Sequence, residues 1–103
     1  MPIRVVFSQQ AIRQLDDLEG YIADRSYPER AIRYTRRLIR FCNRLGLAPN
    51  TGQLLELSRA GVRSVGFERR ITVYFQASPM QVTVLGIYYA GRQPGPHDLD
   101  DMP

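Results

Sequence analysis

Alternating apolar residues predict one β-strand at the start of the chain and three more in its second half. Residues 3–7 (IRVVF) place an apolar side chain at every second position, which is typical of a short strand. Residues 62–67, 71–77 and 82–89 are three further strand-like runs with short joins, which predict an antiparallel meander. The last run, VTVLGIYY, is apolar at both parities, that is, at odd and even positions alike, so we expect an interior strand covered on both faces.

Helical periodicity predicts two helices between the first strand and the meander. From Gln9 to about Arg25, apolar residues recur at steps of three and four, and Ser8 precedes them at the N-cap position. Pro28 suits the first position of a second helix, and Gly46 suits the position just past its end. Because few residues separate the two helices, we expect them to fold back on each other as an antiparallel helical hairpin.

The order strand, helix, helix, strand, strand, strand predicts an α+β fold. In this fold the N-terminal strand and the three-stranded antiparallel meander complete one sheet, and the helical hairpin packs on one face of it. Residues 47–60 are predicted to be a connection with a tight turn. We expect residues 1–95 to form a single domain and residues 96–103 to form a flexible acidic tail.

The second predicted helix separates apolar from charged residues. Its apolar arc contains Leu38 and Cys42, has Tyr34 and Phe41 at its edge, and is wider than one contact surface requires, so part of it is expected to await a partner. The opposite arc, the arginine stripe, consists of Arg30, Arg33, Arg36, Arg37, Arg40 and Arg44. The stripe is either a solvated face or a docking surface for an acidic partner or nucleic acid. In the first interpretation its charge is partly balanced by four acids of the neighbouring helix, Asp16, Asp17, Glu19 and Asp24.

Composition narrows the classes of function. The chain has 103 residues and a net charge of +4, but three of its ten acids lie in the last six residues, so the remainder carries +7. This charge favours an acidic partner. With one cysteine, Cys42, and one histidine, the chain has neither a disulfide nor a clustered zinc site, and we expect no metal and no cofactor. Without a long apolar run or a signal-like start, we expect a soluble cytoplasmic protein with no membrane partner.

Several segments, taken in order, resemble the ParE/RelE superfamily of bacterial toxins, and its ParE-like members most closely. They are LEGYIADRS in the first helix, PNTG after the second, GVRSV at the start of the meander, RRITVYFQ on its middle strand and VTVLGIYYAGRQP at its end. Together they span roughly residues 3–95. The resemblance implies a type II toxin that a cognate antitoxin, ParD-like or similar, holds inactive by wrapping its C-terminal segment around the domain.

The two branches of this superfamily differ in chemistry. RelE-like toxins cut messenger RNA on the ribosome with basic residues on the sheet and a C-terminal tyrosine, whereas ParE-like toxins inhibit DNA gyrase without catalysis. Of the ribonuclease positions, this chain keeps Arg63 and Arg92, and the others fall on Val65, Phe67, Thr72 and Asp98. RNA cleavage needs donors placed where charge develops and a group that moves a proton. We therefore expect no catalytic residue and a non-enzymatic protein that binds gyrase, through its A subunit, and contacts DNA only indirectly.

Two sets of candidate binding residues follow from this resemblance and from the residue pattern. The target-binding set is Arg63, Arg70, Tyr74, Tyr88, Tyr89, Arg92 and His97. The antitoxin-binding set is Leu18, Ile22, Tyr34, Leu38, Phe41, Arg37 and Arg40. The tyrosines of the sheet either cap it or form a basic aromatic surface with the arginines. His97 is either exposed and idle or the one group suited to acid–base work.

Two other functions stay open at this point. The enzyme alternative is a RelE-like, ribosome-dependent endoribonuclease that would use Arg63 and Arg92. The other is a plain nucleic-acid-binding module, for which the +7 charge of the body is the support.

Overall fold

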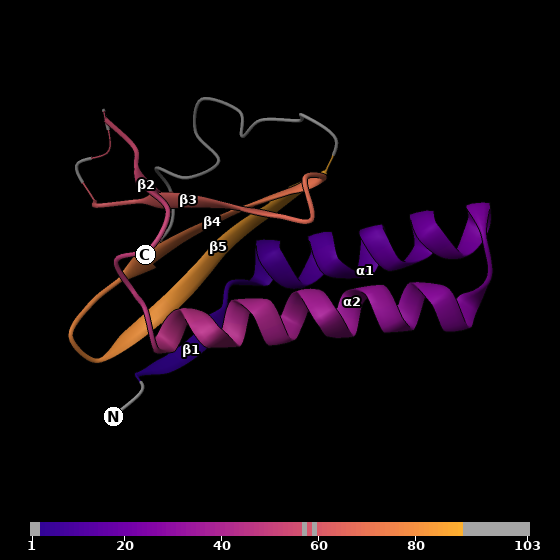
Figure 1. The fold of residues 1–103 in the computed structure, drawn as a ribbon, viewed down its shortest axis with the longest axis horizontal. Coiled ribbons are helices and arrows are strands. Elements are labelled where there is room, and N and C mark those ends of the chain that lie inside the picture. Colours follow the sequence, from indigo (N-terminus) through magenta and orange to yellow (C-terminus); the bar gives the residue numbers. More distant parts are fainter. Residues whose placement is uncertain (1–2, 57, 59, 90–103) are drawn as a thin grey trace.

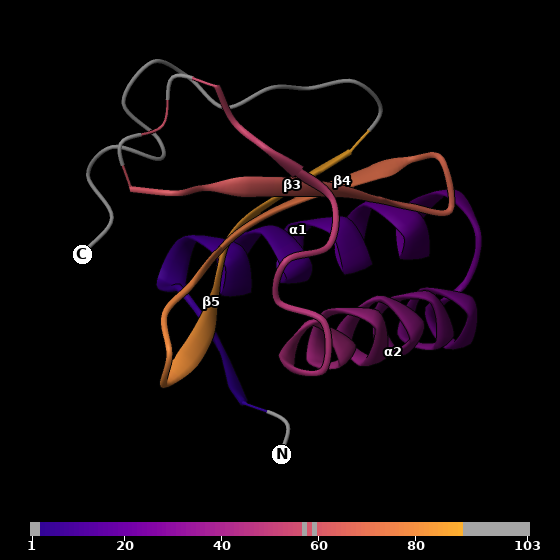
Figure 2. The same cartoon turned by 60° about the vertical axis from the view of Figure 1, so that its left-hand side comes forward.

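The structure is a computed structural model that describes residues 3–56, 58 and 60–89. Its elements are β1 (Arg4–Phe7), α1 (Gln9–Arg25), α2 (Pro28–Asn43), a 3-10 turn (Arg44–Gly46), β2 (Gln53–Leu54), β3 (Arg63–Phe67), β4 (Ile71–Ala77) and β5 (Gln81–Tyr89). The predicted fold is confirmed: one sheet lies over an antiparallel helical hairpin (Figures 1 and 2). The boundary predicted near residue 95 and the acidic tail lie outside the described residues.

The sheet has the strand order β1-β5-β4-β3-β2. β1 pairs with β5 in parallel, and the other pairs are antiparallel. The sequence pattern missed β2, a two-residue strand in which Gln53 pairs with Ser64 and Leu54 with Arg63. Two residues are too few to show an alternating pattern, so this strand was predicted as part of a connection.

Local chemistry fixes the two helices where the sequence predicts them. The Ser8 hydroxyl accepts from Ala11 N (3.0 Å) as the N-cap of α1, and it donates to the Leu85 carbonyl (3.0 Å), which ties the helix to β5. Pro28 stands at the first turn of α2. The prediction for Gly46 was wrong. α2 ends at Asn43, and Gly46 is a buried residue whose carbonyl accepts from Ile3 N (3.0 Å).

A β-bulge explains why β5 is apolar at both parities. The pairing of β5 with β4 shifts between Tyr74 and Phe75, so that Leu85 is the extra residue. Val82 and Val84 face the hairpin before the bulge, and Ile87 and Tyr89 face it afterwards, because one extra residue reverses the parity. β5 is the interior strand that the sequence predicts, and both faces hold buried residues, since Leu85 is also buried.

The core lies between the sheet and the hairpin. Its largest fully buried side chains include Phe75, Val73 and Val84 from the sheet and Leu38 and Cys42 from α2. Burial raises the pKa of the Cys42 thiol to about 12, in keeping with its place in the predicted apolar arc. No helix within the described residues is both long enough and apolar enough to cross a membrane.

Candidate interaction surfaces

A ladder of tyrosines and arginines lies where β5 ends beside α1. The guanidinium of Arg25 sits 3.6 Å from the centre of the Tyr21 ring, and that ring lies 5.3 Å from the ring of Tyr89. Arg70 Nη1, from the turn between β3 and β4, donates to the Tyr89 hydroxyl (3.2 Å). Tyr21, Arg25 and Arg70 are exposed. We call these four residues the tyrosine ladder; it contains two residues of the predicted target-binding set.

Tyr34 and its neighbours form a second cluster beside the ladder. The Tyr34 ring packs edge-on against Phe67 (5.8 Å between centroids), and Phe41 packs on the same ring of Phe67 (5.1 Å). The Tyr34 hydroxyl is buried and has no hydrogen-bond partner among the described residues. Its pKa is raised, chiefly by burial and then by the nearby Glu68 carboxylate. Tyr34 and Phe41 are therefore packed at the core edge, as their place at the edge of the predicted apolar arc indicates.

The turn between β3 and β4 carries the partner of Arg37. Arg37 Nε and Nη2 donate to the two carboxylate oxygens of Glu68 at 3.0 and 3.1 Å, a two-pronged pair on the surface. The hydrogen bond from Arg37 lowers the pKa of Glu68. Glu68 and Arg69 both have a positive φ, 49° and 62°, which non-glycine residues rarely adopt. The turn thus directs the Glu68 carboxylate toward α2.

The predicted target-binding set does not form one surface. Tyr74 and Tyr88 pack against each other (5.5 Å between ring centroids) on the sheet face away from the hairpin. Gln10 Nε2, from the first turn of α1, donates to the Tyr88 hydroxyl (2.8 Å). Arg63 lies at the opposite end of β3 from Arg70 and donates to the Asn50 carbonyl (2.9 Å). Tyr89 faces the hairpin, so the described tyrosines and arginines do not lie on one basic aromatic face, which was one of the two interpretations. Arg92 and His97 lie outside the described residues.

Two members of the predicted antitoxin-binding set are core residues. The exposed fraction is 6% for Leu18 and 0% for Leu38, so neither side chain is available to a partner in this fold. Ile22, like Tyr34 and Phe41, is partly buried against the core. The helical spacing identified the buried face correctly, but that face is occupied by the sheet. Arg37 and Arg40 remain exposed.

Three positions that carry basic groups in the ribonuclease pattern are Val65, Phe67 and Thr72 in this chain. They lie in β3 and β4, which pair with each other without a register shift. Val65 and Phe67 pack against the core cluster, and β3 and β4 pair without interruption from Arg63 with Phe75 to Phe67 with Ile71. Thr72 lies opposite Gly66 within this ladder. No register slip places basic side chains at these positions.

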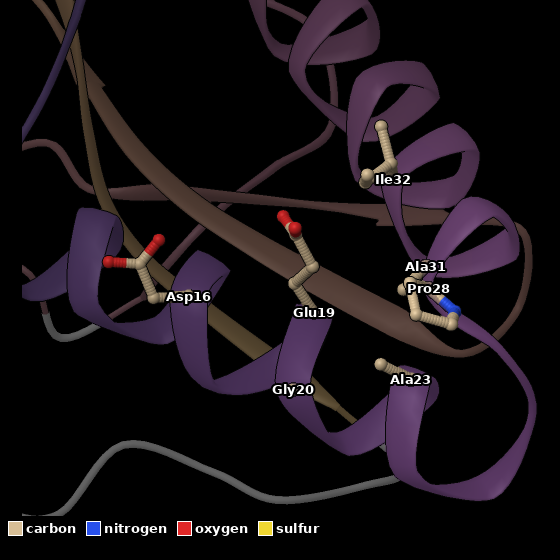
Figure 3. A pocket seen from close by; sticks show the side chains of 7 residues that line it. All are labelled: Asp16, Glu19, Gly20, Ala23, Pro28, Ala31 and Ile32. Carbon is tan, nitrogen blue, oxygen red and sulfur yellow. The ribbon is translucent and has the colours of Figure 1, made fainter.

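A groove of about 220 Å³ runs between the two helices. Figure 3 shows the carboxylates of Asp16 and Glu19 and the side chain of Ile32 directed into the space between α1 and α2. Gly20, Ala23, Pro28 and Ala31 complete its lining. Glu19 Oε2 accepts from the Thr35 hydroxyl (3.3 Å), which is itself buried. Ile32 is 38% exposed. Part of the wide apolar arc predicted from the sequence is therefore open to solvent.

The arginine stripe is exposed, as both of its interpretations require, and within the described residues it makes no ion pair with the first helix. All six of its arginines are exposed. Among the described residues, the ion pair that the stripe makes is Arg37 with Glu68, which belongs to a turn of the sheet. The acids of α1 make no ion pair with it in this part of the chain.

Comparison with known proteins identifies the family. Residues 5–94 match the family described as "ParE toxin of type II toxin-antitoxin system, parDE". Two solved structures have the same fold. The chromosomal ParDE system of P. aeruginosa has a TM-score of 0.74 at 17% identity, over 85% of this chain and 96% of that chain. The toxin–antitoxin complex RelBE2 of Mycobacterium tuberculosis has a TM-score of 0.67 at 18% identity, over 89% and 95%.

Among curated proteins, no sequence matches the chain significantly. At such low identities the two solved structures establish the fold alone. The family match is different, because it covers nearly the whole chain and agrees with the segments quoted from the sequence. The chain belongs to the ParE toxin family of type II toxin–antitoxin systems.

Proposed function

We propose that this toxin inhibits DNA gyrase in the cytoplasm by binding its A subunit, without catalysis of its own, and that a ParD-like antitoxin neutralises it. The observation that carries the non-enzymatic part is the packing of Val65 and Phe67 into the core. RNA cleavage requires donors that converge on a phosphate. Within the described residues, Arg63 and Arg70 lie at opposite ends of β3 and do not converge.

We propose the tyrosine ladder as the target-binding surface. Tyrosine and arginine are the residue types enriched among those that dominate protein interfaces. Tyr21 is 39% exposed, and its ring is held between the guanidinium of Arg25 and the ring of Tyr89. Such mutual packing reduces the side-chain freedom that binding would otherwise remove.

Supercoiling assays test the target and the surface together. Purified toxin, freed of antitoxin, should inhibit supercoiling by gyrase. The double variant Arg25→Ala/Arg70→Ala should lose most of this inhibition, whereas Arg4→Ala/Arg13→Ala, which removes two exposed arginines elsewhere, should retain it. Arrest of translation with gyrase left untouched would disprove the proposal. Equal loss in both variants would disprove only the choice of surface.

We propose the groove between α1 and α2 as the seat of an apolar segment of the antitoxin. The support is the small residues that line it beside the carboxylates of Asp16 and Glu19, and the exposure of Ile32 together with Ile12, which lies one helical turn before Asp16. The two structural relatives are themselves toxin–antitoxin systems. Ile32→Glu should weaken antitoxin binding, and Met80→Glu, at an 80% exposed site away from the hairpin, should not. An unchanged affinity for Ile32→Glu would exclude the groove.

The second candidate function is a RelE-like ribosome-dependent endoribonuclease. It is favoured by Arg63 and Arg92, which stand at two positions of the ribonuclease pattern, and by the fold shared with the RelBE2 complex. Mapping of messenger ends after expression decides between the two functions. Cuts at ribosomal positions would support the ribonuclease, and intact messengers would remove it.

A further inference from the structure

The arginine stripe forms a straight, continuous surface. At about 100° per residue, its six arginines lie within an arc of about 120°; five of them are on α2, and Arg44 begins the 3-10 turn that follows it. The span from Arg30 to Arg44 is about 21 Å along the helix axis, at about 1.5 Å per residue. All six side chains are exposed. The stripe lies on the side of α2 opposite the buried residues Leu38 and Cys42, and none of its members lines the groove with α1.

The stripe opposes the stability of the isolated protein. Like charges three or four positions apart on a helix repel each other. In the stripe these pairs are 30/33, 33/36, 33/37, 36/40, 37/40 and 40/44. Only Arg37 has a carboxylate partner within the described residues, and that partner is Glu68. The uncompensated repulsion would be relieved by an extended polyanion.

The chemistry of the stripe fits a phosphate backbone better than an acidic peptide. Arginine clusters bind acidic peptide motifs as well as phosphates, but a helix-in-groove peptide would need apolar pockets, and the exposed positions of this face are arginines in one continuous row. A duplex carries one phosphate per about 3.4 Å of each strand, so about 21 Å of duplex presents about six phosphates on one strand. Arginine binds phosphate with two parallel hydrogen bonds.

We propose that the arginine stripe of α2 binds the phosphate backbone of duplex DNA directly and without sequence preference. This surface is separate from the groove and from the tyrosine ladder. The proposed inhibition of gyrase requires contact with DNA only through gyrase, so this direct contact goes beyond it. A failure of the gyrase proposal would leave this direct contact untouched, because bare DNA is sufficient to test it.

The test is the salt dependence of binding to a fluorescently labelled 24-base-pair duplex, measured by anisotropy with the full chain. The logarithm of the binding constant should fall linearly with the logarithm of the NaCl concentration, and each phosphate contact should contribute about −0.9 to the slope. The stripe variant Arg36→Gln/Arg40→Gln should reduce this slope by about 2. It removes no side-chain hydrogen bond or ion pair of the described residues, and glutamine is a good helix former.

The charge-matched control is Arg4→Gln/Arg13→Gln, two exposed arginines on β1 and α1. If the stripe is the site, the control keeps the wild-type slope, and Arg36→Lys/Arg40→Lys restores most of it. Equal losses in stripe variant and control would overturn the proposal, because total charge would then explain binding. Binding of a polyglutamate peptide with no binding of the duplex would also overturn it.

Discussion

Two glycines of this domain differ in what their missing side chain permits. At Gly46 an added Cβ would collide with the backbone carbonyl of Ile3, so glycine is required where β1 enters beside the 3-10 turn. At Gly20 an added Cβ would meet no atom within 4 Å. The sequence alone cannot separate these cases, because the neighbour at Gly46 comes from a distant part of the chain.

Gly20→Ala should raise the free energy of unfolding by about 1 kcal/mol, because glycine in a helix interior is less favourable than alanine by that amount. Urea unfolding at neutral pH measures it. Gly46→Ala is the control of opposite sign, and should lower the unfolding free energy by at least about 1 kcal/mol because the chain must shift. A loss of stability in Gly20→Ala would mean that another element approaches α1 at this point.

The buried hydroxyl of Tyr34 is a second feature at the scale of one residue. A polar group buried without a partner is destabilising, so Tyr34→Phe should leave stability unchanged or raise it by up to about 1 kcal/mol. Tyr27→Phe, at an exposed ring whose hydroxyl accepts from Arg33, is the control and should change little.

The raised pKa of Tyr34 gives the same variant a test at alkaline pH. When the pKa is higher in the folded state, stability is fully present below the unfolded value of about 10 and is lost as the pH rises through the folded value. Wild type should therefore lose stability above about pH 10 faster than Tyr34→Phe. Parallel curves for the two proteins would show that the hydroxyl is solvated.

The elements of this fold follow from local sequence, and the places where prediction failed follow from pairing between elements. The limits of α1, β3, β4 and β5 agree closely with the periodic patterns. The bulge at Leu85 and the two-residue strand β2 did not show in the pattern, since each depends on a partner strand. The face of Tyr89 was misjudged for the same reason, because the bulge reverses parity after Leu85.

The pair between α2 and the turn after β3 predicts how stability responds to acid. The pKa of Glu68 is lowered in the folded state, so its contribution is fully present above the unfolded pKa of about 4.3 and is lost as the pH falls through the folded value. Both side chains are more than 40% exposed, so the contribution is about 0.5 kcal/mol or less.

Glu68→Gln should therefore be less stable than wild type by up to about 0.5 kcal/mol at pH 7, and this deficit should shrink toward pH 2 as the Glu68 carboxylate of wild type becomes protonated. Urea unfolding at the two values measures this difference. Glu56→Gln is the control, at an exposed residue without an ion pair in this part of the chain. A deficit that persists at pH 2 would point to the strained turn at Glu68 instead of the ion pair.

At the scale of the whole molecule, the sequence predicted the types of residue that make the candidate surfaces better than their arrangement. Arg70 and Tyr89, both in the predicted target-binding set, are in contact, and Tyr21 and Arg25 join them from α1 through the way the hairpin packs on the sheet. Leu18 and Leu38 were assigned to a partner, and the sheet covers them instead. Periodicity identifies a buried face but not what buries it.

The distribution of charge over the molecule predicts that salt stabilises the free toxin. The six like-charged pairs of the stripe are screened as the Debye length falls from about 10 Å at 0.1 M to about 3 Å at 1 M. The free energy of unfolding should rise by about 1 kcal/mol between 0.05 and 1 M NaCl, since each pair contributes about 0.2–0.5 kcal/mol of repulsion at low salt. Urea titrations at several NaCl concentrations measure this rise.

The variant Arg36→Gln/Arg40→Gln removes four of these six pairs (33/36, 36/40, 37/40 and 40/44), so its stability should rise by less than half as much. Arg4→Gln/Arg13→Gln lowers the net charge equally but leaves every pair of the stripe in place. Its free energy of unfolding should therefore rise with salt as much as that of wild type. Equal responses in the two variants would mean that the repulsion is spread over the molecule. A response confined to the stripe would mean that repulsion along α2 destabilises the free protein, and that a bound polyanion would relieve it.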